Sequence, residues 1–231
     1  MASPSESAVV AEQEDARTDG PMTGDKRVVF DHWLDLYRDT VLLKIAGLDA
    51  GQLARRAVPP SSMSLIGVVR HLAEVEAYWL RLVLLDEQDV PDYYCTPASP
   101  DGDFDDIDIV TAAADVAAYC AELATTRANM SAWTDLDAPV RGLRKGSSVN
   151  LRWILIHLIE EYARHLATWT CYGKLSTDAR RAPGGFRFGC ERQGGTLGRD
   201  EPTDHRRASL RWSAAWFRRG VLRPIRLWGR W

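Results

Sequence analysis

Apolar side chains recur at every third or fourth position between residues 62 and 85, which is the spacing that places them on one face of an α-helix. The preceding Pro-Pro-Ser-Ser at 59–62 is typical of a loop that enters a helix, and Ser62 or Ser64 is a suitable N-cap. The segment therefore predicts a long amphipathic helix that ends near Leu85. Its apolar stripe consists of Leu65, Val68, Val69, Leu72, Val75, Trp79, Leu82 and Val83.

Three further segments show the same period. We expect helices over residues 29–46, over 109–133 and from about residue 148 onward. The connection 86–107 is rich in acids and turn-forming residues, and of two interpretations, the rim of a pocket or a solvated connection, the composition favours the solvated connection. No segment reads as a β-strand. Four amphipathic helices in about 140 residues predict an all-α fold, a four-helix bundle.

The two ends of the chain lack this periodicity. Residues 1–27 are rich in Ala, Ser, Glu, Asp and Gly, which predicts a disordered N-terminal leader before a helical domain at 28–170. Residues 171–231 contain many glycines, prolines and arginines without a helical or strand period, so we expect an irregular C-terminal tail.

The sequence excludes several classes of protein. No apolar run approaches the roughly 20 residues of a transmembrane helix, so we expect no membrane partner. The N-terminus lacks the basic start and apolar core of a secretory signal. The four cysteines stand far apart without a C-x-x-C pair, which excludes a zinc ribbon and indicates a reduced protein of the cytoplasm.

The charge is unevenly distributed, although the net charge of the chain is only -3. Residues 166–231 hold 14 Lys and Arg against 5 Asp and Glu, together with 9 of the 17 glycines and 5 of the 9 tryptophans. A basic arm that binds nucleic acid is one interpretation. Such arms usually carry a folded or repeated basic motif, which is absent here, so nucleic-acid binding stays an alternative function that we do not expect.

Three polar residues on the two most strongly patterned helices are candidates for chemistry. Glu161 and His165 are spaced i, i+4 on one helix face, and His71 lies at the edge of the other stripe. Buried carboxylates and imidazoles are costly unless they are paired or bound to a metal. Two histidines and one carboxylate can hold a divalent metal and leave a coordination position open. An ion pair with a satisfied core histidine is the simpler interpretation, and His157 with Glu161 forms a second i, i+4 pair.

Two segments, PPSSMSLIGVVRHLAEVEAYWLRLVL and LRWILIHLIEEYARH, resemble the mini-circle protein branch of the DinB-like superfamily, and the resemblance extends over residues 28–165. It implies a metal-binding four-helix bundle. The pattern is similar to that of the mycothiol-dependent maleylpyruvate isomerases, in which a glutamate is the first member of the ligand pair on the last helix. Carried over to this chain, the implied metal ligands are His71, Glu161 and His165, and His157 becomes a core residue or one that orients a ligand.

The same resemblance implies an activity. A divalent metal, zinc or alternatively nickel, would hold a low-molecular-weight thiol such as mycothiol as a thiolate for attack on an electrophilic small molecule. We therefore expect a metal-dependent thiol transferase or isomerase with a small-molecule substrate. A non-catalytic helical bundle is the alternative function. Helix faces of such bundles often dimerise, so a homodimer is also considered.

The sequence departs from the family directly after the second segment. The family continues with a glycine, the run D-L-L-R-E and a D-G turn, whereas this chain reads LATWTCYGKLSTDAR. If one base was lost, or two were gained, after the codon of His165, the other frame turns Trp169-Thr170 into Asp and Cys171-Tyr172 into Leu for every codon choice. We hypothesise that residues from about 166 onward are translated out of frame, which also explains their basic charge and lost periodicity.

Overall fold

The structure is a computed structural model that describes residues 7–57 and 60–176, and for residues 168 and 170–176 it describes the backbone alone. The chain divides into two compact units, residues 1–180 and 181–231, and every described residue belongs to the first. The described residues form helices and loops without a β-strand, which confirms the predicted all-α fold. The elements are α1 (Lys26–Ile45), α2 (Ala50–Ala54), α3 (Leu65–Ala77), the π-helix η1 (Tyr78–Val83), α4 (Gly102–Asp105), α5 (Ala112–Ala132) and α6 (Leu151–Ser176).

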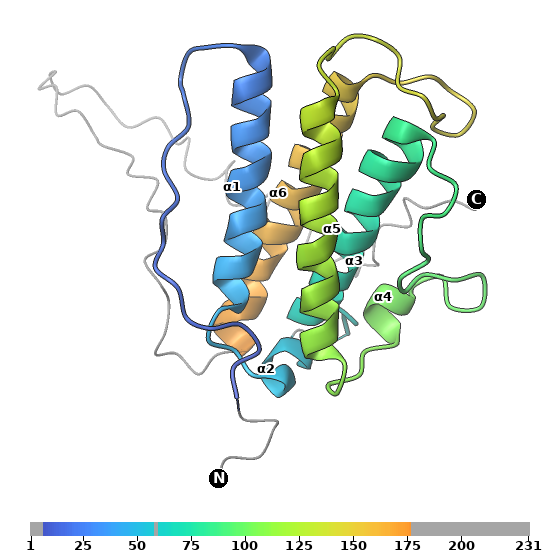
Figure 1. Cartoon of the computed structure of the whole chain (residues 1–231). Helices are drawn as coiled ribbons and strands as arrows, with labels where there is room; N and C mark the ends of the chain where they lie inside the picture. The colour runs from blue at the N-terminus through green and yellow to red at the C-terminus, as the bar shows by residue number, and fades with distance from the viewer. Residues whose placement is uncertain (1–6, 58–59, 177–231) are drawn as a thin grey trace, which may run out of the picture. The chain divides into compact units, whose positions relative to one another are not determined.

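Four long helices, α1, α3, α5 and α6, form the bundle (Figure 1). α3 packs against α5 and α6, and α1 packs against α6. The short helices α2 and α4 both contact α3, so α3 is the most covered helix of the four. Because η1 continues α3 directly, the single helix predicted over 62–85 is α3 and η1 together. Within the described part of the chain, no helix is long and apolar enough to cross a membrane.

Side-chain caps explain where the helices begin. Asp25 accepts a hydrogen bond from the backbone N–H of Arg27 at the start of α1. Ser64, one of the two predicted caps, accepts from the backbone N–H of Gly67 and begins α3. Asn150 Oδ1 accepts from the backbone N–H of Trp153 and begins α6 close to the predicted start. Each cap satisfies one of the backbone donors that the first turn of a helix leaves unpaired.

α6 extends past the predicted boundary at residue 170 and reaches Ser176. Leu166 and Trp169 are both buried, so this helix continues to contribute to the core after His165. The remainder of the predicted irregular tail 171–231 lies outside the described residues.

The core of the bundle contains a group of polar side chains that joins all four long helices. We call it the Arg38 network; its members are Arg38 of α1, Glu76 of α3, Tyr119 and Thr126 of α5, and Tyr162 of α6. All five are fully buried. On α1 the charged Arg38 is therefore inside the core, whereas the apolar Trp33 is 44% exposed.

Residues 7–24 run along α1 (Figure 1). The backbone N–H of Val9 donates to the carbonyl of Leu48, and the N–H of Gly47 donates to the carbonyl of Val10. Arg17 Nη1 donates to Thr40 Oγ1 on α1 at 2.6 Å. The composition of the predicted disordered leader 1–27 did not indicate these contacts. Residues 1–6 lie outside the described residues.

Candidate metal centre

The structure brings the three predicted site residues together in the contact between α3 and α6. His71 comes from α3, while Glu161 and His165 come from successive turns of α6. One ligand atom from each residue lies within 4.8 Å of the other two. The side chains are 11% exposed for His71 and Glu161 and 19% for His165, so the cluster is largely shielded from water and still has an accessible edge.

Both imidazoles point their Nε2 atoms at the same carboxylate oxygen. His71 Nε2 lies 3.4 Å and His165 Nε2 lies 3.3 Å from Glu161 Oε1. These distances exceed the roughly 2.7–3.2 Å of ordinary N–H···O hydrogen bonds. Two donor atoms bound tetrahedrally to one zinc at about 2.1 Å lie about 3.4 Å apart. The spacing of the donors and their chemical types therefore fit a divalent metal.

The charges of the three residues depend on one another. Burial lowers the pKa of His71, but the carboxylates of Asp103 and Glu161 outweigh it and raise this pKa to about 9. Burial raises the pKa of Glu161, but the two imidazoles hold it well below its usual range. The pKa of His165 is lowered, mainly by burial. At neutral pH the metal-free cluster consequently holds a protonated His71, an ionised Glu161 and a neutral His165.

A fourth residue, which no pattern in the sequence indicated, lies at this site. Asp103 of α4 places its Oδ2 atom 2.8 Å from His71 Nδ1, on the opposite edge of the ring from Glu161. Asp103 is 3% exposed and its neighbour Phe104 is 6% exposed. The prediction of a solvated connection over 86–107 is therefore wrong, because the segment folds back onto α3 and buries these side chains. The acidic composition of this segment is that of an exposed loop, so the composition does not indicate the burial of Asp103 and Phe104.

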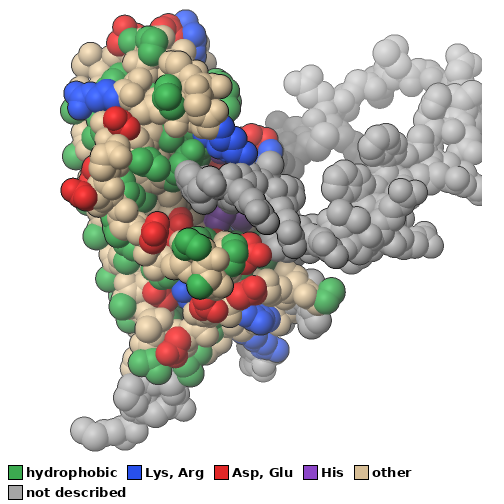
Figure 2. Space-filling view, turned by 90° about the vertical axis from the view of Figure 1, so that its right-hand side faces the viewer, with side chains coloured by type: hydrophobic (Ala, Val, Ile, Leu, Met, Phe, Trp, Pro, Cys, Tyr) green, Lys and Arg blue, Asp and Glu red, His purple; other side chains and the backbone are tan. Residues whose placement is uncertain are grey.

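Aromatic rings and acidic side chains surround the cluster. The rings of His71 and His165 lie 4.6 Å apart between centroids, and the ring of Phe104 lies 5.3 Å from that of His71. Figure 2 shows histidine atoms at the surface of the side that carries α3 and α4, with acidic side chains around them.

His157, which offered a second i, i+4 pair with Glu161, lies outside the cluster of His71, Glu161 and His165. Its ring stacks on Trp153 at 5.3 Å and packs against Trp79 at 4.7 Å. Burial lowers its pKa, so the ring is neutral near pH 7. Among the described residues His157 is a packing residue and is not a member of the donor cluster.

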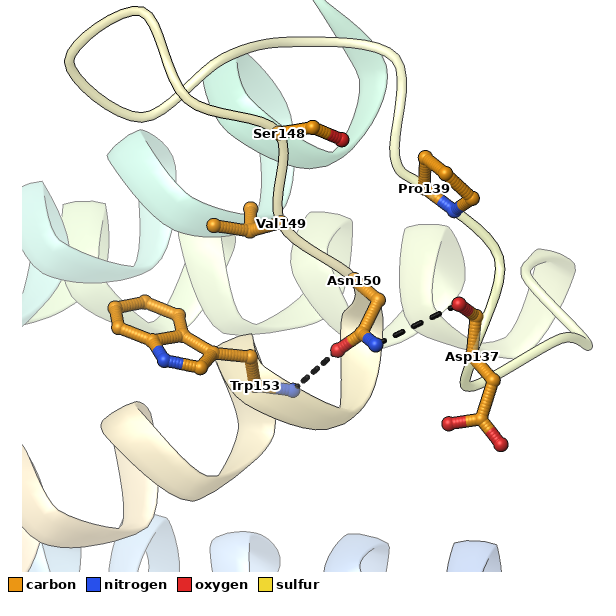
Figure 3. Close-up of a pocket in the computed structure, with 6 residues that line it drawn as sticks. All are labelled: Asp137, Pro139, Ser148, Val149, Asn150 and Trp153. Carbon is orange, nitrogen blue, oxygen red and sulfur yellow. Dashed lines mark hydrogen bonds between the residues drawn. The ribbon is translucent and has the colours of Figure 1, made fainter.

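A pocket near the start of α6 is separate from this cluster (Figure 3). Asn150 uses its side chain there to bridge two backbone groups, the N–H of Trp153 at 2.9 Å and the carbonyl of Asp137 at 3.5 Å. These bonds cap α6 and tie it to the preceding loop. The pocket is lined by Asp137, Pro139, Ser148, Val149, Asn150 and Trp153.

Comparison with known proteins supplies the family. No curated protein and no solved structure matches the chain significantly. The model of one protein family, described as mycothiol-S-transferase, matches residues 29–167. The match covers more than half of the chain, including α1, α3, α5 and all three clustered residues, and it agrees with the DinB-like resemblance of the sequence. The chain belongs to the mycothiol-S-transferase family.

Proposed function

We propose that the protein binds one divalent metal through His71, Glu161 and His165 and transfers a low-molecular-weight thiol to an electrophilic small molecule. The observation that carries the proposal is the convergence of both Nε2 atoms on one oxygen of Glu161 at the spacing of metal ligands. Zinc is the metal that this donor set fits best, and nickel is the alternative.

The side chains of the cluster have distinct tasks in this proposal. Once the metal displaces the Nε2 proton of His71, His71 and His165 would offer neutral nitrogens, and Glu161 would offer one negative charge. A divalent ion held there would keep a net positive charge, lower the pKa of a bound thiol and favour its nucleophilic thiolate form. In the transfer the thiol would release its S–H proton to solvent, its sulfur would form the bond to the electrophilic carbon, and the leaving group of the electrophile would depart with the electron pair of the bond that breaks. The partly exposed edge of His165 marks the side from which a small molecule reaches the cluster.

The experiment is elemental analysis of the purified chain beside two histidine variants. We expect about one zinc or nickel per chain in the wild type and in His157→Ala, whose ring packs away from the cluster, and none in His71→Ala. Loss of the metal in His157→Ala with retention in His71→Ala would contradict the ligand assignment. Absence of metal from the wild type after reconstitution with zinc would support a non-catalytic bundle. Thiol transfer from mycothiol to a chromogenic electrophile then tests the activity itself.

We also propose that residues from about 166 onward are translated out of frame. The protein itself is proposed to be located in the cytoplasm. The family match ends at residue 167, two residues after His165, which supports a change of frame near this point. All three proposed ligands precede the change, so the cluster is retained. Resequencing the locus in several close strains tests the idea, and an intact, identical frame in all of them would contradict it.

A further inference from the structure

We infer that Asp103 is a positioning residue for the proposed metal centre: it holds the ring of His71 so that Nε2 faces the cluster. The inference rests on the proposed function. Asp103 Oδ2 lies 2.8 Å from His71 Nδ1, while His71 Nε2 points at Glu161 Oε1. An imidazole that donates its Nδ1–H to a carboxylate has its other nitrogen free as a ligand, and the carboxylate makes that nitrogen more basic.

The burial of Asp103 indicates that this contact is built into the fold. Its side chain is 5% exposed, and a carboxylate removed from water needs a partner. His71 supplies it on one side. The thiol of Cys95 is a second, weaker donor to this carboxylate, because burial and the charges of Asp103 and Glu74 raise the pKa of the thiol and keep it protonated.

One face of α3 holds the segment that carries Asp103. Gly67 stands one turn before His71, and a Cβ there would meet the ring of Phe104 at 2.9 Å, so only glycine lets α4 approach this closely. Glu74, nearly one turn after His71, accepts the backbone N–H of Cys95 at 2.7 Å. Positions 67, 71 and 74 share a helix face, and His71 therefore lies between two attachment points of the segment.

A third attachment comes from Arg70. Its Nη1 donates to the backbone carbonyl of Asp106 at 2.7 Å, and its guanidinium lies 4.1 Å from the centre of the Tyr94 ring. Arg56 Nη2 also donates to the carbonyl of Phe104 at 3.1 Å. These bonds go to one backbone carbonyl within α4 and to the one directly after it. Replacing the side chain of Asp103 therefore removes the contact with His71 and leaves the anchoring of the segment intact.

Phe104 adds a second restraint on the ring of His71. Asp103 binds the edge of the imidazole, and the ring of Phe104 packs against it at 5.3 Å with an interplanar angle of 32°. The ring is thus limited in rotation about both of its side-chain torsions. A ligand held in this way loses less conformational freedom when the metal binds.

The test is zinc affinity measured by competition with a chelator in wild type, Asp103→Ala, Asp103→Asn and Asp105→Asn. We expect Asp103→Ala to bind zinc about 10- to 100-fold more weakly. Asp103→Asn should be intermediate, because its amide oxygen still accepts the Nδ1–H without the charge. Asp105→Asn changes the same charge on an exposed side chain of the same helix and should match the wild type.

Nitrogen NMR of the zinc-loaded proteins separates positioning from folding. In the wild type we expect His71 to be protonated at Nδ1 and bound through Nε2, and in Asp103→Ala we expect this signature to be lost or mixed. Wild-type affinity and an unchanged His71 signature in Asp103→Ala overturn the inference, and if that variant does not fold, the same outcome in Asp103→Asn does so. Absence of zinc binding by the wild type overturns the proposed function, and the inference with it.

Discussion

Two groups of buried charged side chains connect α3 to α6, and they differ in how completely their hydrogen bonds are made. In the Arg38 network, Arg38 donates to both oxygens of Glu76 at 2.8 and 2.6 Å, and the hydroxyls of Thr126 and Tyr162 donate to the same carboxylate at 2.9 and 2.8 Å. In the proposed metal centre, two imidazoles share one oxygen of Glu161 at longer distances.

The difference distinguishes a structural cluster from the proposed metal centre. The Arg38 network pairs one cation with one anion by short bonds and needs nothing further. In the proposed metal centre, each Nε2 atom lies 3.3–3.4 Å from Glu161 Oε1, which is longer than an ordinary hydrogen bond and close to the separation of two ligands on one metal. Burial of a charged residue does not by itself distinguish the two groups, because each contains a buried glutamate between α3 and α6.

The largest expected effect is on stability and comes from a substitution in the Arg38 network. Glu76→Ala leaves the guanidinium of Arg38 buried without its main partner, so we expect the free energy of unfolding to fall by about 3–5 kcal/mol. Urea denaturation followed by circular dichroism measures it. Asp35→Ala is the matched control, because Asp35 also binds Arg38 but its side chain is 44% exposed, and its loss should cost less than about 1 kcal/mol. Equal losses in the two variants would contradict the comparison.

The second prediction concerns the loss of one ligand from the proposed metal centre. His165→Ala removes one of the three proposed ligands, so zinc affinity should fall by about 100-fold or more, equivalent to about 2.7 kcal/mol. The unfolding free energy of the metal-free protein should change much less. Isothermal titration with zinc and chelator-treated urea curves check the two parts. A large loss of metal-free stability would place His165 with the structural residues.

The third prediction concerns how the stability of the metal-free protein depends on pH through His71. His71 has a pKa of about 9 in the folded, metal-free protein and a lower one when unfolded, so its contribution to stability is complete below about pH 6.5 and is lost as the pH rises through 9. The free energy of unfolding should decline over this interval by roughly 3 kcal/mol. Urea curves at several pH values in the presence of chelator measure it. The decline should be absent in His71→Gln, and its persistence there would assign it to other groups.

The smallest expected effect on the free energy of unfolding comes from removing one hydroxyl group from the Arg38 network. Tyr119→Phe removes a hydroxyl that lies 3.0 Å from the hydroxyl of Tyr162, while Tyr162 keeps its bond to Glu76. We expect a loss of about 1 kcal/mol in the free energy of unfolding, the usual value of one hydrogen bond. Zinc affinity should stay at the wild-type level. A change in zinc affinity would show that the two clusters are coupled through Tyr162 and its neighbour Glu161.

The helices and the site differ in how far they could be predicted. The periods at 62–85, 29–46 and 109–133 located α3 with η1, α1 and α5, because a helix repeats its buried face every three or four residues. The i, i+4 spacing placed Glu161 and His165 on one face in the same way. Arg38 escaped this logic, since a charged residue within a stripe is normally taken for an edge position.

What the sequence by itself determined is the local order: which segments are helical, which faces are apolar, and which two proposed ligands lie on one face of α6, in successive turns. Only the tertiary structure decided that Asp103 meets His71, 32 residues away, and that Arg38 meets Glu76, 38 residues away. The reason is that helical periodicity is set by neighbours along the chain. The pairing of buried charges is set by which helices pack together and by how closely a residue such as Gly67 lets them approach.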